Sequence, residues 1–200
     1  MRVVLTGGIA TGKSHVLDRL AAHGVPTSDA DGWAHDAIAP GGPAWQDVRD
    51  RFGPEVIDAE GRVDRRRLGA IVFTDDAARA DLNAIVHPRV RSAIGAWFDE
   101  IERRPDHRFG VVAIPLFFES ARTESFDRVI VTACEHSAQV ARVVARGFAR
   151  DEAERRIAAQ LPTAEKARRA DHVIRTDGTR ADTDRQVDTL YHELATLSGA

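Results

Sequence analysis

Short apolar runs and helical patterns alternate along the chain. Residues 2–6 are apolar or β-branched, and similar runs recur at about 25–28, 110–115, 128–133 and 172–175. Each run is short enough to indicate a buried strand rather than a helix. Apolar residues recur at helical spacing at about 14–20, 137–147, 151–160, 163–170 and 180–197. Strands that alternate with helices pair in parallel through crossover connections, so we expect a five-stranded, three-layer α/β fold.

The long segment from residue 31 to residue 104 has a helical pattern interrupted by proline and glycine. The interruptions lie at residues 40–43, at Gly53-Pro54 and at Pro88. Proline is favoured at the first position of a helix, and the residue before it is pushed out of the helical conformation. The pair His87-Pro88 therefore predicts a junction between one helix at 77–86 and a longer amphipathic helix at 89–102.

Composition narrows the class of protein. The 200 residues are 43% hydrophobic and 30% charged, and no apolar run approaches the roughly 20 residues that a membrane span requires. Apolar residues follow Arg2 at once, which leaves no room for a targeting peptide. The lone Cys134 cannot form an internal disulfide, and we expect it to be a buried core residue. A net charge of −3 provides no basic field for nucleic acid. We expect a soluble, cytoplasmic protein that binds neither membrane nor nucleic acid.

Residues Gly7 to Ser14 read G-x-x-x-x-G-K-[ST] between a predicted strand and a predicted helix. Glycines let backbone N–H groups curl closely around phosphate oxygens, and the following helix points its positive end at the same anion. Of 28 lysine and arginine residues only Lys13 and Lys166 are lysines, so the motif lysine does not follow from lysine abundance. We expect Lys13 to contact the β- and γ-phosphates of ATP and the Ser14 hydroxyl to bind Mg²⁺. The predicted nucleotide contacts are Gly8, Ile9, Ala10, Thr11, Gly12, Lys13, Ser14 and His15.

Two carboxylates, Asp29 and Asp31, follow the second predicted strand. Transfer of a phosphoryl group to an alcohol needs a carboxylate that orients the hydroxyl and takes its proton. We expect one of the pair to face the triphosphate from the loop of the strand that neighbours the phosphate-loop strand. The alternative is that either aspartate caps the following helix. We do not expect a GTP switch, because neither lysine follows an asparagine, as in the N-K-x-D motif by which GTPases normally recognise guanine.

Arginines near a predicted lid are candidates for charge stabilisation. Arg142 and Arg146 stand four residues apart and so share one helix face, from which they would neutralise the transferring phosphoryl group; a solvated face is the alternative. A polar stretch at 151–160, which contains Arg156, lies between Gly147 and Pro162. It predicts a hinged lid that excludes water, with an ordinary surface helix as the alternative.

In order and spacing, these motifs resemble the dephospho-coenzyme A kinase family over nearly the whole chain. The resemblance implies an adenylate-kinase-like P-loop fold with a core at 1–39, 106–146 and 163–200, a helical substrate subdomain at about 40–105 and a lid at about 147–162. The residues that carry it are Leu5-Thr6-Gly7-Gly8-Ile9, Asp29-Ala30-Asp31, His87-Pro88, Pro115-Leu116-Phe117-Phe118-Glu119, Gln139 with Arg142 and Arg146, Arg156-Ile157 with Gln160, and Ala170-Asp171-His172-Val173-Ile174 before Gly178.

The resemblance also implies a reaction, in which ATP phosphorylates the ribose 3′-hydroxyl of the small molecule dephospho-coenzyme A. It makes Asp31 the candidate general base and Asp29 a water-mediated contact to Mg²⁺ or substrate, and it places His87 and Glu119 by the acceptor. Two positions depart from the family pattern. Ala10 replaces a glycine, which is tolerated if its φ is negative, and Thr176 replaces an asparagine in a turn that bears on adenine contacts.

Two alternatives share the phosphate loop. One is another small-metabolite or nucleoside monophosphate kinase, which has the same phosphate chemistry and a different acceptor. The other is an ATP-sensing binding module, which needs the loop but neither an acceptor carboxylate nor lid arginines. The sequence does not predict an oligomeric state.

Overall fold

The computed structural model describes residues 1–120 and 125–199. The chain forms two compact units. The first consists of Met1–Asp29 and the described residues from Phe98 onward, and the second consists of Ala30–Trp97. The substrate subdomain that the sequence predicted at about 40–105 overlaps most of the second unit.

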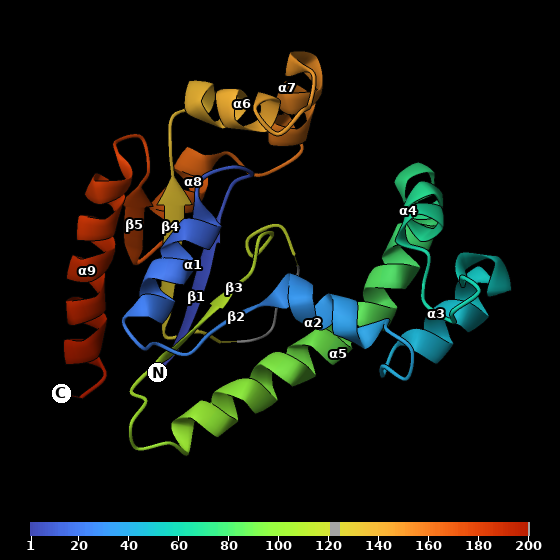
Figure 1. Cartoon of the computed structure of the whole chain (residues 1–200), viewed down its shortest axis with the longest axis horizontal. Coiled ribbons are helices and arrows are strands. Elements are labelled where there is room, and N and C mark those ends of the chain that lie inside the picture. Colours follow the sequence, from blue (N-terminus) through green and yellow to red (C-terminus); the bar gives the residue numbers. More distant parts are fainter. Residues whose placement is uncertain (121–124, 200) are drawn as a thin grey trace. The chain divides into compact units, whose positions relative to one another are not determined.

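The first unit holds a five-stranded sheet (Figure 1). Its strands are β1 (Arg2–Gly7), β2 (Thr27–Asp29), β3 (Gly110–Ala113), β4 (Arg128–Ala133) and β5 (His172–Arg175), in the order β2-β3-β1-β4-β5. Every pairing is parallel, as the sequence predicted. The expectation that the strand before Asp29 neighbours β1 is wrong. β3 is buried along its whole length and needs partners on both sides, whereas the three-residue β2 is half exposed and takes the edge.

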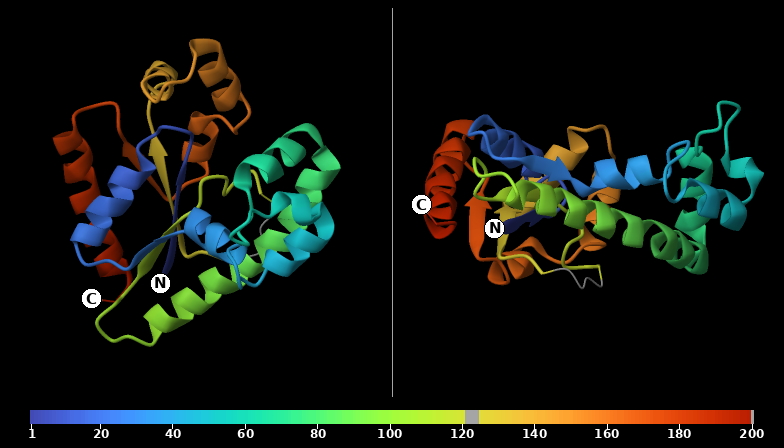
Figure 2. Two further views of the ribbon diagram at one scale, coloured as in Figure 1. Left: turned by 45° about the vertical axis from the view of Figure 1, so that its right-hand side comes forward. Right: turned by 90° about the horizontal axis from the view of Figure 1, so that it is seen from below.

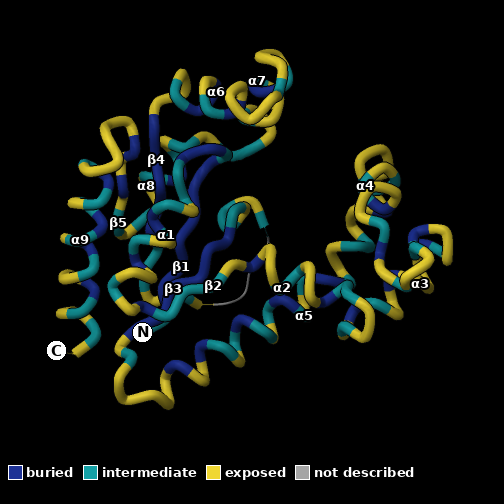
Figure 3. Tube along the Cα trace, in the orientation of Figure 1, coloured by how far each residue is buried: buried dark blue, intermediate teal, exposed yellow. Residues whose placement is uncertain are grey.

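Helices α1 (Lys13–Ala22) and α9 (Arg180–Leu197) lie side by side on one face of this sheet (Figures 1 and 2). Helix α8 (Thr163–Arg168) packs against β4. The strand interiors are buried from both sides (Figure 3), which is typical of a parallel sheet. The core under α1 and α9 contains Val3, Leu5, Val16, Leu20, Val25, Phe109, Val111, Ile130, Ile174, Val187, Leu190 and Leu194.

The second unit is helical and has a core of its own. Its elements are α2 (Ala30–Ala37), α3 (Trp45–Phe52), a 3-10 helix (Pro54–Val56), α4 (Arg65–Thr74) and most of α5 (Asp76–Glu102). The core residues are Val48, Phe52, Val56, Val63, Leu68 and Ala78. Among the described helices, none combines the length and the apolar content needed to cross a bilayer.

Helix α5 runs through Pro88 without a break, so the predicted junction at His87-Pro88 is wrong. A proline inside a helix costs about 3 kcal/mol because it removes one backbone hydrogen bond and crowds the preceding turn. Buried apolar residues at helical spacing continue across the proline, among them Val86 and Val90. Burying each such side chain contributes about 1.5–3 kcal/mol. The Arg89 guanidinium also donates to the Ile85 carbonyl at 2.7 Å in the turn before the proline.

Helices α6 (His136–Val144) and α7 (Arg150–Ala158) pack together beyond the carboxyl end of β4 (Figure 1). α6 is shorter than the predicted 137–147. The Arg146 N–H donates to the Val143 carbonyl, and Gly147 follows with a φ of 94°. The chain therefore turns after Val144, and the expectation that Arg142 and Arg146 share a helix face is wrong.

Candidate phosphate-binding and transfer site

The phosphate loop joins β1 to α1 through positions that admit no side chain. A methyl group on Gly7 would overlap the Thr132 hydroxyl and lie 2.6 Å from the Thr11 hydroxyl. A methyl group on Gly8 would lie 2.7 Å from Gln139 Nε2. Gly12 has a φ of 89°, which glycine adopts without strain, and it directly precedes α1. The loop is therefore a tight backbone cradle in front of a helix N-terminus, the arrangement that binds phosphate.

Three threonine hydroxyls make hydrogen bonds in and around the phosphate loop. The Thr11 hydroxyl donates to the Gly8 carbonyl at 2.8 Å and lies 2.7 Å from the Thr132 hydroxyl, while the Thr176 hydroxyl donates to the Thr11 carbonyl at 2.9 Å. Thr132 belongs to none of the sequence motifs described above. In the sequence, Thr132 could be recognised as a polar residue near the end of the apolar run at 128–133. In the structure it is buried and pairs in register with Gly7.

Alanine in place of the family's glycine was expected to be tolerated if its φ were negative. Ala10 has a φ of 59°, so that condition is not met. The left-handed conformation costs a residue with a side chain roughly 1–2 kcal/mol. The methyl group is buried in an apolar cluster with Val140, Val143 and Ala153. Burying a methyl group contributes about 0.8 kcal/mol, which offsets part of this cost. The cluster also links the loop to α6 and α7.

Two glutamines bind the peptide groups of Ile9. The Ile9 N–H donates to Gln160 Oε1 at 2.8 Å, and Gln139 Nε2 donates to the Ile9 carbonyl at 2.9 Å. The Thr163 hydroxyl in turn donates to Gln139 Oε1 at 3.3 Å. Gln139 and Gln160 carried the family resemblance in the sequence without an assigned function, and the structure brings both to the loop.

Arg142 reaches the loop from α6. Its guanidinium donates to the Ala10 carbonyl at 3.2 Å, to the Thr176 hydroxyl at 3.0 Å and to the Thr176 carbonyl. Its positive charge is therefore fixed beside the phosphate cradle. Thr176, where the family pattern has asparagine, is buried and joins the turn after β5 to the loop. Arg146 lies in the exposed turn after α6.

The first turn of α1 presents the remaining predicted nucleotide contacts. Lys13 is half-buried and Ser14 is exposed, while His15 Nε2 lies 2.8 Å from Asp184 Oδ1 of α9. Mg²⁺ usually keeps several waters and binds through one or two protein oxygens and the phosphates of a substrate. The exposed Ser14 hydroxyl beside the cradle fits that role. Within the described residues no group of three or more His, Cys, Asp or Glu side chains forms a metal cage.

The predicted acceptor residues fall in both units. Asp29 ends β2 in the first unit, whereas Asp31 lies in the first turn of α2 and His87 lies within α5, both in the second unit. Both aspartates are exposed, and His87 is half-buried.

Glu119, the fourth predicted substrate contact, follows β3 in the first unit. One oxygen of its carboxylate accepts the Leu161 N–H at 3.0 Å and lies 2.7 Å from the Lys166 ammonium. The structure thus places Glu119 against protein groups near the end of α7. Arg156 of α7 pairs with Glu152 at 2.7 Å, and its guanidinium lies 4.3 Å from the centre of the Phe148 ring.

Two residues of the first unit, Asp188 and Cys134, have shifted pKa values. Hydrogen bonds from Arg19 and then His23, both on the α1 side, hold the pKa of Asp188 on α9 well below its usual range. Burial raises the pKa of the Cys134 thiol, so the thiol stays protonated. The prediction that Cys134 is a buried core residue is confirmed.

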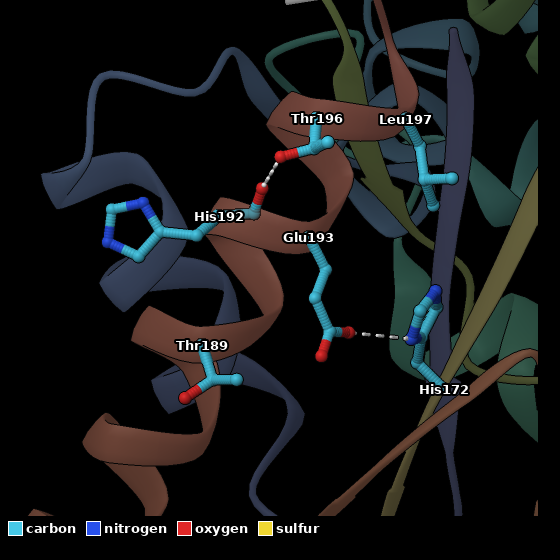
Figure 4. Close-up of a pocket in the computed structure, with 6 residues that line it drawn as sticks. All are labelled: His172, Thr189, His192, Glu193, Thr196 and Leu197. Atoms are coloured by element: carbon cyan, nitrogen blue, oxygen red, sulfur yellow. Dashed lines mark hydrogen bonds and ion pairs between the residues drawn. The ribbon is translucent and has the colours of Figure 1, made fainter.

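A hollow of about 610 Å³ along α9 and β5 lies apart from these residues (Figure 4). His172 faces Glu193, with Nδ1 3.6 Å from Oε2, but His192 points away from both. These side chains do not converge on a common point, so the hollow is not a candidate metal or catalytic centre.

A family model described as dephospho-CoA kinase matches residues 1–182. The chain belongs to the dephospho-CoA kinase family. A dephospho-CoA kinase of Geobacillus kaustophilus is 43% identical over 188 residues, which cover 94% of this chain and 93% of the relative. The resemblance that the motifs indicated is therefore confirmed.

Solved structures agree with this family. A crystal structure from Thermus thermophilus is 32% identical, covers 97% of both chains and superposes with a TM-score of 0.80. The dephospho-CoA kinase of Campylobacter jejuni is 26% identical, with a TM-score of 0.75 over 98% of this chain and 97% of its own. The fold of the dephospho-CoA kinase family thus extends over nearly all of this chain.

Proposed function

We propose that this chain transfers the γ-phosphoryl group of ATP to the ribose 3′-hydroxyl of dephospho-coenzyme A, which gives coenzyme A and ADP. The observation that carries the proposal is the backbone cradle at Gly7–Ser14, with Arg142 fixed beside it, in a chain of the dephospho-CoA kinase family. A cradle of this kind binds a phosphate chain. Dephospho-coenzyme A is the acceptor for which the family is named.

On the phosphate side, the loop amides and the N-terminus of α1 hold the phosphate chain, and Lys13 contacts the β- and γ-phosphates. Bound Mg²⁺ supplies charge neutralisation at the phosphate oxygens, and Ser14 would hold it. Arg142, held by three hydrogen bonds to Ala10 and Thr176, adds a fixed positive charge. Because its position is set before the reaction, little reorganisation is needed as charge develops. Arg146 of the adjoining turn adds a second charge.

On the acceptor side, Asp31 acts as the general base and takes the proton of the 3′-hydroxyl as that oxygen attacks phosphorus. Asp29 would contact Mg²⁺ or the substrate through water, and His87 contacts the substrate. The exposure of both aspartates supports these roles, because an exposed carboxylate can meet a substrate that arrives from solution. A base of this kind contributes about 10²–10⁴-fold in rate.

The segment at about 147–162 serves as a lid. It contains α7, begins at Gly147 with a φ of 94° and ends at Pro162. Arg156, stacked on Phe148, projects from this helix. A lid that closes over ATP excludes water, which otherwise competes with the 3′-hydroxyl as the phosphoryl acceptor.

A coupled assay of ADP release tests the choice of acceptor. Dephospho-coenzyme A, AMP, CMP and shikimate are offered in turn at equal concentration with ATP and Mg²⁺. Dephospho-coenzyme A is expected to stimulate ADP release far above the other three. Preference for another acceptor would make the chain a different metabolite kinase. If no acceptor stimulated ADP release and nucleotide altered association with a partner, the chain would be a binding module.

A further inference from the structure

Of the 28 lysine and arginine residues, only Lys166 and Lys13 of the phosphate loop are lysines. Lys166 lies in α8 with a fully buried side chain. Removing an ammonium from water is costly, and a buried ion pair is often no more stabilising than apolar residues of the same volume. Because nearly all other cationic side chains of this chain are arginines, a buried lysine indicates that this position requires a compact charge. It does not indicate that the charge stabilises the fold.

The partner of this charge is Glu119. The Lys166 ammonium lies 2.7 Å from Glu119 Oε1, and within residues 1–120 and 125–199 it makes no hydrogen bond of normal geometry. The same carboxylate oxygen accepts the Leu161 N–H at 3.0 Å. Leu161 lies between α7 and α8, so this oxygen ties the loop after β3 to the segment that ends the lid.

The residue before Leu161 binds a second loop of the same unit. Gln160 Oε1 accepts the Ile9 N–H of the phosphate loop at 2.8 Å. The Ile9 carbonyl is bound by Gln139, which is bound in turn by Thr163 of α8. Two consecutive residues at the end of the lid thus bind two loops at the carboxyl edge of the sheet.

We propose that Glu119 and Lys166 are positioning residues for phosphoryl transfer. Together they fix Gln160 and Leu161 as the pivot on which α7 closes over the phosphate loop. This inference rests on the proposed function, and it assigns Glu119 a role other than contact with the acceptor. A fixed pivot returns α7 to the same place at each closure, which keeps water away from the γ-phosphoryl group. A displacement of about 1 Å in such a part can cost on the order of 10²-fold in rate.

The double variant Glu119→Leu/Lys166→Met tests this role, because it removes both charges at similar volume and leaves no buried ion unpaired. Its Tm, its kcat and KM for dephospho-coenzyme A, and its ratio of ATP hydrolysis to phosphoryl transfer are compared with the wild type. We expect a Tm lower by no more than a few degrees, because the Leu161 N–H loses its acceptor, together with a kcat lower by about tenfold or more and a clearly higher hydrolysis ratio. The control Glu165→Gln/Arg169→Met removes a solvent-accessible ion pair between α8 and the residue that follows it, and should match the wild type in all four quantities.

A lower Tm with unchanged kcat and hydrolysis ratio would show a merely structural pair and overturn the inference. A raised KM for the acceptor with unchanged kcat would return Glu119 to substrate binding and also overturn it. If the double variant fails to fold, Gln160→Ala removes the bond to Ile9 without touching a buried charge. It should raise the hydrolysis ratio in the same way, and an unchanged ratio would contradict the pivot. A wild type without transfer activity would instead refute the proposed function.

Discussion

Ala10 carries opposing contributions to the stability of the phosphate loop. Its positive φ of 59° is a strained conformation for a residue with a side chain, while its methyl group is buried against α6 and α7. The strain of roughly 1–2 kcal/mol is opposed by about 0.8 kcal/mol from the methyl group. A further 0.5–1 kcal/mol or so of backbone entropy favours alanine over glycine. These terms nearly cancel, so alanine at this position costs the protein little.

Substitutions at Ala10 separate strain from packing. Ala10→Gly should change the free energy of unfolding by less than about 1 kcal/mol, because it relieves strain and loses packing together. Ala10→Val places a β-branched side chain at positive φ in a buried cluster and should lower the Tm by several degrees at least. Thermal denaturation of the two variants against the wild type measures this. A valine variant as stable as the glycine variant would contradict the strain that the structure assigns to Ala10.

Asp31 is the residue on which the proton transfer depends. Asp31→Asn keeps the size of the side chain and removes the base, so kcat should fall by at least about 10²-fold. Binding of ATP, measured by titration calorimetry, should stay nearly the same because the phosphate loop is untouched. Asp36→Asn, a second exposed carboxylate on α2, is the matched control and should keep full turnover. Near-normal turnover of the Asp31 variant would remove it from the mechanism.

At the scale of elements, α1 leads from the phosphate loop and is held to α9 by ion pairs. Asp188 of α9 binds both Arg19 and His23 of the α1 region, at 2.8 and 2.7 Å. The helix that begins directly after the phosphate loop is thereby held to α9.

The lowered pKa of Asp188 predicts how this link depends on pH. Because the folded state favours the charged carboxylate, its stabilising contribution is complete above the unfolded pKa of about 3.9. It is lost as pH falls through the lower folded pKa. Asp188→Asn should therefore lower the Tm at pH 6, and the gap to the wild type should narrow as pH drops below about 4. Asp18→Asn, an exposed carboxylate on α1, is the control for a generic loss of negative charge. A gap that widened toward low pH would contradict the assignment.

Most elements were predictable because hydrophobic periodicity is a local property. All five strands and the helices α1, α7, α8 and α9 lie close to their predicted ranges. The local pattern did not predict the features that depend on residues distant in the sequence. The place of β3 between β1 and β2 depends on the distant strands with which its two edges pair, and the passage of α5 through Pro88 follows from buried apolar residues on either side of it. Neither is visible within a window of a few residues.

The candidate site divides in the same way. The glycines, Lys13 and Ser14 were predictable because backbone geometry demands them in a fixed order. The contacts of Thr132, Thr176 and Gln160 with the loop were not, because each joins residues more than 100 positions apart. Lys166 could be singled out in the sequence because it is the second of only two lysines. Its ion pair with Glu119 was identified only from the structure.

On the scale of the whole molecule, the residues with proposed roles lie in both units. The phosphate loop, Arg142 and the lid belong to the first unit, and Asp31 and His87 belong to the second. Phosphate chemistry of this kind is shared by many kinases, so the identity of the acceptor is the property that distinguishes this one.

The most direct test of the central claim follows the transferred phosphorus into its product. The enzyme is incubated with dephospho-coenzyme A and ATP labelled in the γ-phosphoryl group, and the product is examined by mass spectrometry and phosphorus NMR. One labelled phosphate is expected, as a monoester on the ribose 3′-oxygen, in step with the ADP formed. Label found only in inorganic phosphate, or on any other oxygen of the substrate, would contradict it.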